Sequence, residues 1–204
     1  MPITQITLLP GYPAEVRERL VARVSAALRA TIASPEAGTT TYVHEAVTYR
    51  RDGRVMTEGR AALPVAGELV QGFLQAMEAR DLARARSFLS PAFTMVFPGG
   101  VQPASLEALV ERSAARYRRV GKHIARIDEC YASEGTVVYV HGTLHGQWPD
   151  GAPFEGIRYI DRFLVVEGLL VHQEVWNDLA EHRLAGQLAG AGRAGSADPA
   201  DPRA

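Results

Sequence analysis

The first 60 residues alternate between two short apolar stretches of strand character and one long amphipathic segment. Residues 2–9 combine β-branched and aliphatic side chains and end at Pro10, which predicts a short strand. From residue 14 to residue 32 the apolar positions recur every three or four residues, which is the spacing of an amphipathic helix. Residues 39–49 are rich in Thr, Val and Tyr and predict a second strand. The pattern therefore predicts a β-α-β unit in which a helix connects two parallel strands.

The rest of the chain has a different order of elements, with helices first and long strands last. Its periodicity predicts helices over residues 65–79, 82–89 and 106–119, and strands over residues 93–97, 124–131, 136–145, 157–166 and 169–176. Polar turns that contain glycine separate the last strands, as antiparallel neighbours require. We therefore expect an α+β fold in which helices pack on one face of a curved antiparallel sheet.

These two patterns divide the chain into domains. Residues 58–67 are small, apolar and irregular, which is typical of a linker. We expect a first unit over residues 1–60 and a second domain over residues 65–184. Residues 185–204 have almost nothing to bury, and we expect them to form a disordered tail.

The composition excludes several classes of protein. The 22 basic and 23 acidic side chains give a net charge of −1, which argues against a general nucleic-acid binder. Cys130 is the single cysteine, so an intrachain disulfide and a zinc site of several thiolates are excluded. The N-terminus has no secretion signal and no run of 18 apolar residues occurs, so we expect a cytoplasmic protein without a membrane partner.

The first unit resembles the 4-oxalocrotonate tautomerase family over residues 2–59. The resemblance rests on PITQITLLPG directly after the initiator Met, the length of the following helix, the Ser34-Pro35 break and a strand that ends near His44 and Glu45. It implies that Pro2 is a catalytic acid or base once Met1 is removed. A free N-terminal proline is a secondary amine, and burial beside positive charge lowers its pKa toward neutrality. The alternative is that Pro2 only begins an edge strand, where proline is tolerated.

Arginines that hold substrate carboxylates in that family are replaced here. The family's arginine positions correspond to Tyr12 and Thr40 in this sequence. Tyr12 could orient a carbonyl group through its hydroxyl, and Arg50, Arg51 and Arg54 could supply positive charge from the turn after the second strand. The alternative for this arginine cluster is a solvated surface.

The second domain resembles the nuclear-transport-factor-2-like superfamily, and within it the SnoaL-like group. The sequences that carry the resemblance are QGFLQAMEARDLARARSFLSPAF, VVYVHGTLHG and IRYIDRFLVVEGLLVHQEVWND. The resemblance implies a cone with a pocket between helices and a concave sheet, a fold that serves isomerases, cyclases, dehydratases and proteins without catalysis. Phe73 and Phe97 stand where ketosteroid isomerases of this superfamily place a tyrosine and an aspartate, which disfavours that chemistry.

Five polar or aromatic residues of the second domain are candidates for a pocket. His141 and His145 are about 13 Å apart on a strand, too far for one metal ion. If the face of His141 is concave, His141 and Asp161 would line an apolar cup, where the pKa of a carboxyl group rises into the range of a base. Glu174 and Trp176 lie late in the last strand, and the resemblance implies an acid–base role for Asp178. The alternative for each is a structural hydrogen bond or the solvated outer face.

Taken together, the sequence predicts enol–keto proton transfer on a small carbonyl compound, with Pro2 as the catalyst and the cone as a ligand-binding domain. Two alternatives remain open: a cyclase or isomerase that acts in the cone while the first unit serves assembly, and a ligand-binding protein without catalysis. We expect no cofactor and no metal, and a small molecule as partner. Because a β-α-β unit of 60 residues leaves sheet edges and one sheet face uncovered, we also expect a homo-oligomer.

Overall fold

The chain consists of two separate units. The computed structural model describes residues 2–57, 59 and 61–194, with side chains as far as residue 186. The contacts within the chain divide it into Met1–Leu63 and Pro64–Ala204, so that the division falls inside the irregular stretch 58–67.

The first unit has the β-α-β order that its sequence predicts. Strand β1 (Ile3–Leu8) is followed by helix α1 (Ala14–Thr31), a short 3-10 turn η1 (Glu36–Gly38) and strand β2 (Thr40–Glu45). The strands β1 and β2 pair in parallel along their whole length. No residue in the described part of this unit is buried, so its helix and its two strands do not enclose a core of their own.

The segment after β2 differs from the single long strand predicted over residues 39–49. Strand β2 ends at Glu45, which is opposite Leu8, the last residue of β1. The amide of Ala46 donates the final hydrogen bond between the two strands, to the carbonyl oxygen of Leu8. The chain instead forms a hairpin of β3 (Tyr49–Arg51) and β4 (Arg54–Met56). Asp52 and Gly53 connect these strands with φ angles of 51° and 77°, the left-handed conformation that Asp-Gly hairpin turns adopt.

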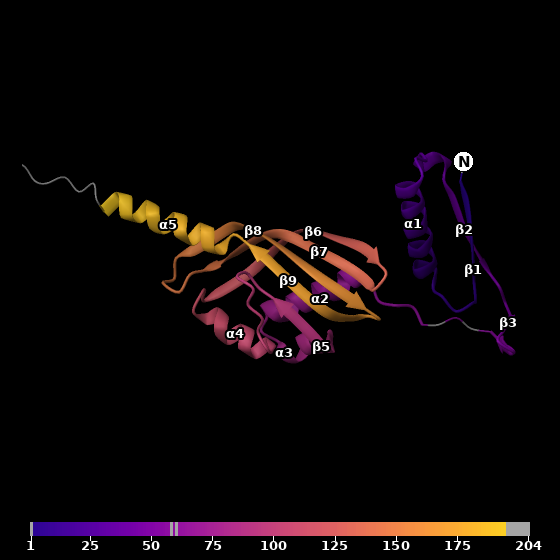
Figure 1. Cartoon of the computed structure of the whole chain (residues 1–204), viewed down its shortest axis with the longest axis horizontal. Helices are drawn as coiled ribbons and strands as arrows, with labels where there is room; N and C mark the ends of the chain where they lie inside the picture. The colour runs from indigo at the N-terminus through magenta and orange to yellow at the C-terminus, as the bar shows by residue number, and fades with distance from the viewer. Residues whose placement is uncertain (1, 58, 60, 195–204) are drawn as a thin grey trace, which may run out of the picture. The chain divides into compact units, whose positions relative to one another are not determined.

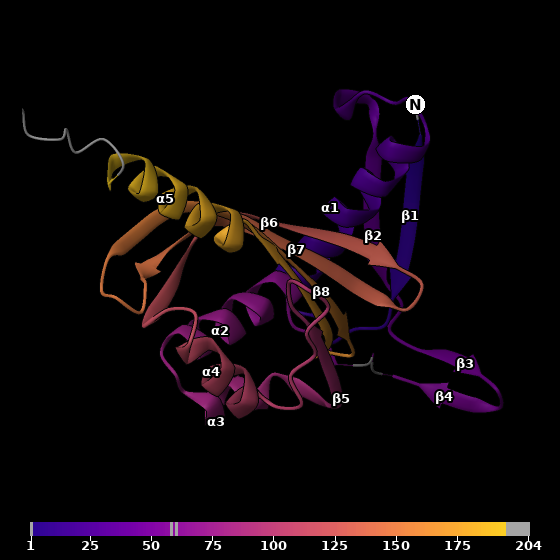
Figure 2. The same ribbon diagram turned by 60° about the vertical axis from the view of Figure 1, so that its left-hand side comes forward.

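The second unit is the α+β fold expected from the sequence. Its elements are α2 (Ala66–Glu78), α3 (Leu82–Ser87), β5 (Leu89–Val96), α4 (Leu106–Ala114), β6 (Arg119–Ala132), β7 (Gly135–Gln147), β8 (Pro153–Val166), β9 (Leu169–Asn177) and α5 (Leu179–Ala194). The helices α2, α3 and α4 lie on one face of the curved five-stranded sheet (Figures 1 and 2). This concave face, together with these helices, encloses the interior of the unit.

The five strands of this sheet follow the order β5-β9-β8-β7-β6. All neighbours are antiparallel except β5 and β9, which pair in parallel. The expectation of a wholly antiparallel sheet was therefore wrong for its first strand. A parallel neighbour needs a long crossover connection, and the whole segment from α4 through β8 connects β5 to β9.

The core lies between α2 and the inner face of β7 and β8. On β7 the fully buried apolar side chains are Val138 and Val140. On β8 the fully buried apolar side chain is that of Phe163, which contacts Phe73 of α2 edge to face. The pairing of β7 with β8 shifts by one residue near Gly156, whose φ of 73° is typical of a bulge. This bulge bends the sheet around the helices.

Several predicted boundaries differ from the observed ones, and β5 and β8 each begin four residues before the predicted strands. Helix α4 ends at Ala114 and Arg119 already begins β6, whereas the sequence predicted one helix as far as residue 119. Helix α5 continues to Ala194, beyond the predicted start of the tail at residue 185, and residues 195–204 of that tail lie outside the described residues. None of the described helices combines the length and the apolar character needed to cross a membrane. The cytoplasmic location remains a prediction.

We predict that Gly142→Ala strongly destabilises the second unit. A Cβ atom at Gly142 would lie 1.9 Å from the carbonyl oxygen of His123, so β6 and β7 would have to separate there. The expected loss is at least about 3 kcal/mol of unfolding free energy, the upper end of the range for overpacking. Urea unfolding measures this loss, and Gly186→Ala on the open surface of α5 is the control. Equal stability of the two variants would contradict the close approach.

Candidate active site

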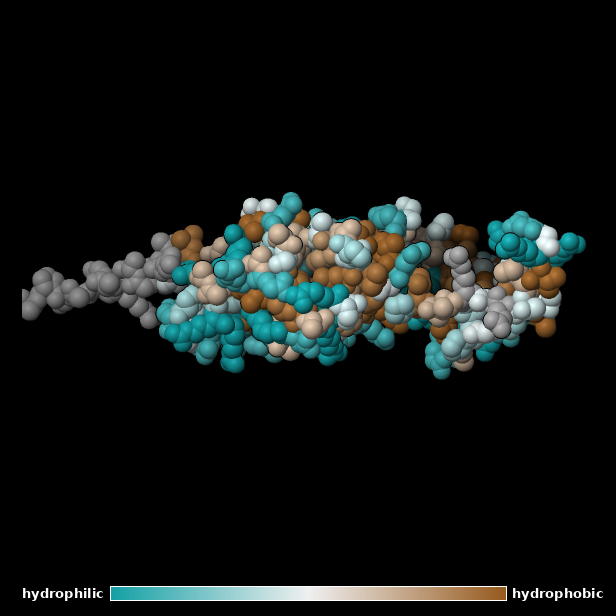
Figure 3. Space-filling model, turned by 90° about the horizontal axis from the view of Figure 1, so that it is seen from below, coloured by the Kyte–Doolittle hydropathy of each residue, from teal (hydrophilic) through white to brown (hydrophobic). Residues whose placement is uncertain are grey.

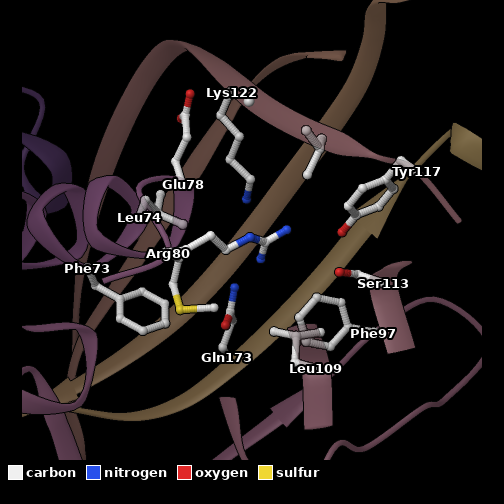
Figure 4. A pocket seen from close by; sticks show the side chains of 13 residues that line it. Phe73, Leu74, Glu78, Arg80, Phe97, Leu109, Ser113, Tyr117, Lys122 and Gln173 are labelled. Carbon is white, nitrogen blue, oxygen red and sulfur yellow. The ribbon is translucent and has the colours of Figure 1, made fainter. Parts of the chain in front are cut away.

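A cavity of about 110 Å³ lies between the helices and the concave face of the sheet in the second unit. Its wall is formed by residues of five elements or the turns next to them, and it combines apolar side chains with six polar or charged ones (Figure 4). The lining residues are Phe73, Leu74, Met77, Glu78, Arg80, Phe97, Leu109, Ser113, Tyr117, Val120, Gly121, Lys122 and Gln173. An apolar cavity with a few converging polar groups is the usual form of a small-molecule site.

A buried ion pair lies at the wall of this cavity. Asp161 is directly opposite Val140 and Val175 in the sheet, so its carboxylate is on the inner face, where it is fully buried. Lys122 extends from the edge strand β6, lines the cavity and donates a hydrogen bond from Nζ to Oδ2 of Asp161. The lysine side chain keeps 23% of its surface exposed, whereas Asp161 has none. A ligand in the cavity would therefore contact the ammonium group, with the carboxylate behind it.

The surroundings of Asp161 set its protonation. Burial raises the pKa of Asp161, while the positive charge of Lys122, its hydrogen bond and the amide of Gln173 act in the opposite direction. Its second oxygen, Oδ1, has no hydrogen-bond partner in the described part of the chain. The net direction is upward, because the loss of water around a fully buried carboxylate outweighs the single ammonium group beside it.

Tyr159 shares the environment of this ion pair. The ammonium group of Lys122 lies 4.5 Å from the centre of the Tyr159 ring, within the range of a cation–π contact. Burial raises the pKa of Tyr159, and the negative charges of Asp161 and Glu78 raise it further. Tyr159 is therefore a neutral phenol at physiological pH, which can donate a proton in a hydrogen bond but cannot act as a base.

Glu78, at the end of α2, and His145 of β7 approach the same glycine, Gly121. A Cβ atom at Gly121 would lie 2.7 Å from Oε1 of Glu78 and 2.5 Å from Nε2 of His145, so both groups converge on the space above this glycine. His145 also stacks on His123 with a distance of 4.2 Å between the ring centres, and its Nδ1 atom is buried without a partner among the described residues. Glycine at position 121 leaves room for both groups.

The far wall of the cavity carries two hydroxyl groups. Ser113 of α4 is buried and donates a hydrogen bond to the carbonyl oxygen of Val110. Figure 4 shows the hydroxyl of Tyr117 turned toward Ser113. Phe97 lines the same wall and Phe73 lines the side of α2, so the two phenylalanines singled out in the sequence both face the cavity.

The structure brings one of the five predicted residues of the second domain to the interior. Asp161 lies there, directly opposite Val140 of β7. Because successive residues of a strand point to opposite faces, His141, the residue after Val140, is on the outer face. The expected cup lined by His141 and Asp161 is therefore wrong. Glu174 pairs with Arg162 and Trp176 is 48% exposed, both on the face opposite the buried Gln173.

Asp178, the fifth of these residues, lies just beyond β9. Its carboxylate pairs with Arg158 at 2.7 Å, and its carbonyl oxygen accepts a hydrogen bond from the amide of His182 at the start of α5. It does not line the cavity of Lys122. These contacts connect β8, β9 and α5, so Asp178 has a structural role in the described geometry.

The candidates of the first unit do not come together within one chain. Tyr12 and Arg51 line a separate cavity of about 570 Å³ at the end of β1, while Arg50 and Arg54 are exposed on the hairpin and are not among its lining residues. Pro2 precedes the start of β1, and its carbonyl oxygen accepts a hydrogen bond from the amide of Thr40. At about 3.3 Å for each strand residue, roughly 17 Å of β1 separate Pro2 from Thr7 at this cavity.

Several residues of the site were not singled out from the sequence. The clearest signal was Lys122, the one lysine in a chain with 21 arginines. Glu78 and Arg80 lie at the end of a helix and in a short turn, positions that read as solvated surface. The described residues contain no cluster of three His, Cys, Asp or Glu side chains arranged to hold a metal ion.

We predict that Lys122→Met lowers stability in a pH-dependent way. Because the pKa of Asp161 is raised in the folded state, ionisation of its carboxyl group destabilises the fold as the pH rises through that pKa. This destabilisation disappears as the pH falls toward the ordinary pKa of 3.8. Loss of Lys122 removes the opposing charge. The expected loss is about 3–5 kcal/mol at pH 8, less at pH 5, and smaller again in Lys122→Met/Asp161→Leu. Urea unfolding at both pH values checks this, and a loss independent of pH would contradict it.

Comparison with known proteins agrees with this architecture. The family model for SnoaL-like domains matches residues 70–173, just over half of the chain. A comparison with curated proteins finds no match.

Three solved structures show the range of similarity. An NTF2-like protein of unknown function from Burkholderia pseudomallei is 17% identical, with a TM-score of 0.47 over 56% of this chain and 92% of that one. A Pseudomonas putida protein provisionally described as a polyketide cyclase is 19% identical, with a TM-score of 0.45 over 55% of this chain and 91% of that one. Another with the same description, from Xanthomonas campestris, is 21% identical, with a TM-score of 0.45 over 56% and 90%. On the match of the family model, the chain belongs to the family of SnoaL-like domains.

Proposed function

We propose that the second unit catalyses proton transfer at a carbon atom next to a carbonyl group, on a small compound bound in the cavity of Lys122. The observation that carries the proposal is the ammonium group of Lys122, which is held by the fully buried Asp161 and lines the cavity between the helices and the sheet. Such a fixed positive charge stabilises the negative oxygen of an enolate better than mobile water does.

In this proposal Lys122 is the group that binds the carbonyl oxygen. Its ammonium donates a hydrogen bond to that oxygen and stabilises the charge that develops there when the neighbouring carbon loses a proton. Asp161 does not line the cavity, so it is a positioning residue that holds the lysine side chain in place. This differs from the role of base that we considered for Asp161 from the sequence.

Glu78 is the base of the proposed reaction. Glu78 is one of the lining residues, and its Oε1 atom approaches the space above Gly121 together with Nε2 of His145. Glu78 takes the proton from carbon, the electron pair of the C–H bond becomes the new C=C bond, and the carbonyl electrons move to the oxygen at Lys122. Return of the proton to a different carbon gives an isomer, whereas attack of the enolate on a second carbonyl group of the same molecule closes a ring.

The size of the cavity favours a small substrate. Its volume of about 110 Å³ is well below the roughly 300–1,000 Å³ of sites for drug-sized ligands. It is comparable to an engineered cavity of about 150 Å³ that holds benzene. A compound of one ring or less fits this volume, and a fused polycyclic polyketide does not.

We expect the protein to exchange the α-hydrogens of cyclohexanone for deuterium in D₂O, measured by NMR. Glu78→Gln should lower the rate by about 10²–10⁴-fold because it removes the base, and Lys122→Met by about 10²–10³-fold because the enolate oxygen loses its charge partner. Glu174→Gln, the same change on the outer face, should leave the rate unchanged. Exchange no faster than in buffer would instead support a ligand-binding domain without catalysis.

The first unit provides a second candidate for proton transfer, based on Pro2. The observation that favours it is the parallel β-α-β unit that begins directly after Pro2. With Met1 attached, the nitrogen of Pro2 is a tertiary amide and cannot accept a proton. Removal of Met1 would convert it into a secondary amine at the start of β1.

We expect the purified protein to begin at Pro2 and to tautomerise phenylenolpyruvate. Pro2→Ala should lose most of this activity, because a primary amine changes both the basicity and the position of the nitrogen. Intact-mass measurement and the loss of enol absorbance check the two statements, and Glu78→Gln is the control because it removes the base of the other unit. An active preparation that retains Met1 would exclude Pro2 from the reaction.

We also propose that the first unit assembles with further copies of itself. Its described residues form no buried core, and the outer sheet face, which includes Ile3 and Tyr42, remains exposed. Figure 3 shows brown, apolar surface on this unit. A two-stranded sheet with one helix is too small to be stable alone.

We expect sedimentation equilibrium of the full chain at micromolar concentration to give a mass above that of one chain. Tyr42→Glu, which places a charge on the outer sheet face of the first unit, should shift the distribution toward smaller species. Leu169→Glu, at an exposed position of the second unit, is the control. A monomer at this concentration would contradict the assembly.

A further inference from the structure

Arg80 occupies a backbone position that favours glycine. It lies in the three-residue connection between α2 and α3, with a φ of 60°. Its amide bonds to the carbonyl oxygen of Met77, and the amide of Asp81 bonds to that of Ala76, so these residues close the end of α2. Helices commonly end in this left-handed conformation, and the residue there is usually glycine because a Cβ atom is strained in it. An arginine at this position therefore carries a backbone strain that glycine would avoid.

The side chain of Arg80 extends into the cavity. Arg80 is among the lining residues, and Figure 4 shows its guanidinium group reaching toward the amide of Gln173, on the same side as the ammonium of Lys122. Glu78 points away from it in this view. The left-handed turn thus directs a second positive charge into the space where the ligand would bind.

The two cations of the cavity differ in their partners. Lys122 is paired with Asp161. Among the residues that the structure describes, Arg80 has no ion pair and no hydrogen bond to another side chain, although Glu78 is only two residues away. Apart from Glu78, the lining residues that α2 contributes are apolar: Phe73, Leu74 and Met77. An unpaired guanidinium in such surroundings is suited to a carboxylate, which it binds through two parallel hydrogen bonds.

We propose that the substrate is a small keto acid, whose carboxylate is bound by Arg80 while its ketone oxygen lies at Lys122. This inference rests on the proposed function of the cavity, because it places the reacting ketone at Lys122. Arg80 is then a residue that determines specificity and orientation: it fixes the anionic end of the molecule and directs the carbon next to the ketone toward Glu78. A neutral ketone would bind without this anchor and in several orientations.

Binding of levulinate and of its methyl ester to the full-length protein tests the inference. Both are small enough for the cavity and differ in the charge of one group. NMR titration should show levulinate binding at least fivefold more tightly than the ester. Arg80→Gly and Arg80→Gln should reduce this ratio to about one, mainly by weakening the binding of levulinate.

Glu167→Gly is the matched control, because Glu167 has a similar φ of 49° in the turn between β8 and β9 and does not line the cavity. Both glycine variants relieve the same kind of backbone strain, so their melting temperatures should shift in the same direction, and Glu167→Gly should keep the preference for levulinate. Equal affinity of the wild-type protein for the two probes, a preference that survives in Arg80→Gln, or no saturable binding of levulinate would overturn the inference.

Hydrogen exchange in the same samples separates this inference from the proposed function. Exchange of both probes at equal rates, with equal affinity, would leave proton transfer in place and reject the role of Arg80. Preferential binding of levulinate without any exchange would support an anionic ligand and reject the catalytic role of Glu78.

Discussion

The ion pair between Asp161 and Lys122 is the interaction on which the second unit depends. A fully buried carboxylate is tolerated in a protein interior only when an opposite charge and hydrogen bonds compensate for the water that it loses. Asp161 is on β8 and Lys122 is on the edge strand β6, with β7 between them. The pair therefore requires all three strands to be in their observed register, and in return it holds one ammonium group at a fixed point of the cavity wall.

This arrangement accounts for the division of roles among the charged groups of the cavity. The charge of Lys122 is compensated by Asp161, and its ammonium group lines the cavity. Glu78 and Arg80 come from the end of α2 and its turn, and in the proposal they contact the ligand directly. Glu78 and Arg80 are exposed, whereas Lys122 is held against the buried carboxylate of Asp161. The proposed site for an anionic carbonyl compound rests on these three charged groups.

The first unit contrasts with the second because it forms its elements without enclosing a core. Its parallel strands and its helix follow from local periodicity and from the Pro10 and Pro35 breaks. Their stability requires contacts that the described residues of one chain do not provide. Assembly and the chemistry of Pro2 are for this reason connected questions, since the surroundings of Pro2 depend on what covers the sheet.

The sequence was sufficient to predict the order and type of nearly every element, because hydrophobic periodicity is a local property. It failed where long-range pairing decides the outcome. On β7 both faces carry apolar residues, so the pattern alone did not show that Val138 and Val140 face inward and His141 outward. The parallel pairing of β5 with β9 and the meeting of Lys122 with Asp161 depend on residues 39 or more positions apart. Asp161 was recognised as a candidate because its neighbours two residues away on β8 are apolar or aromatic.

The state of Lys122 is the most direct test of this account. As the chain has one lysine, protein labelled with ¹⁵N-lysine gives a single side-chain ammonium signal in a heteronuclear NMR spectrum. The account predicts that hydrogen bonding to the buried carboxylate protects this signal from exchange with water at neutral pH, and that Asp161→Asn shifts or broadens it while Glu174→Gln does not. An ammonium signal that is the same in wild type and Asp161→Asn would contradict the central ion pair.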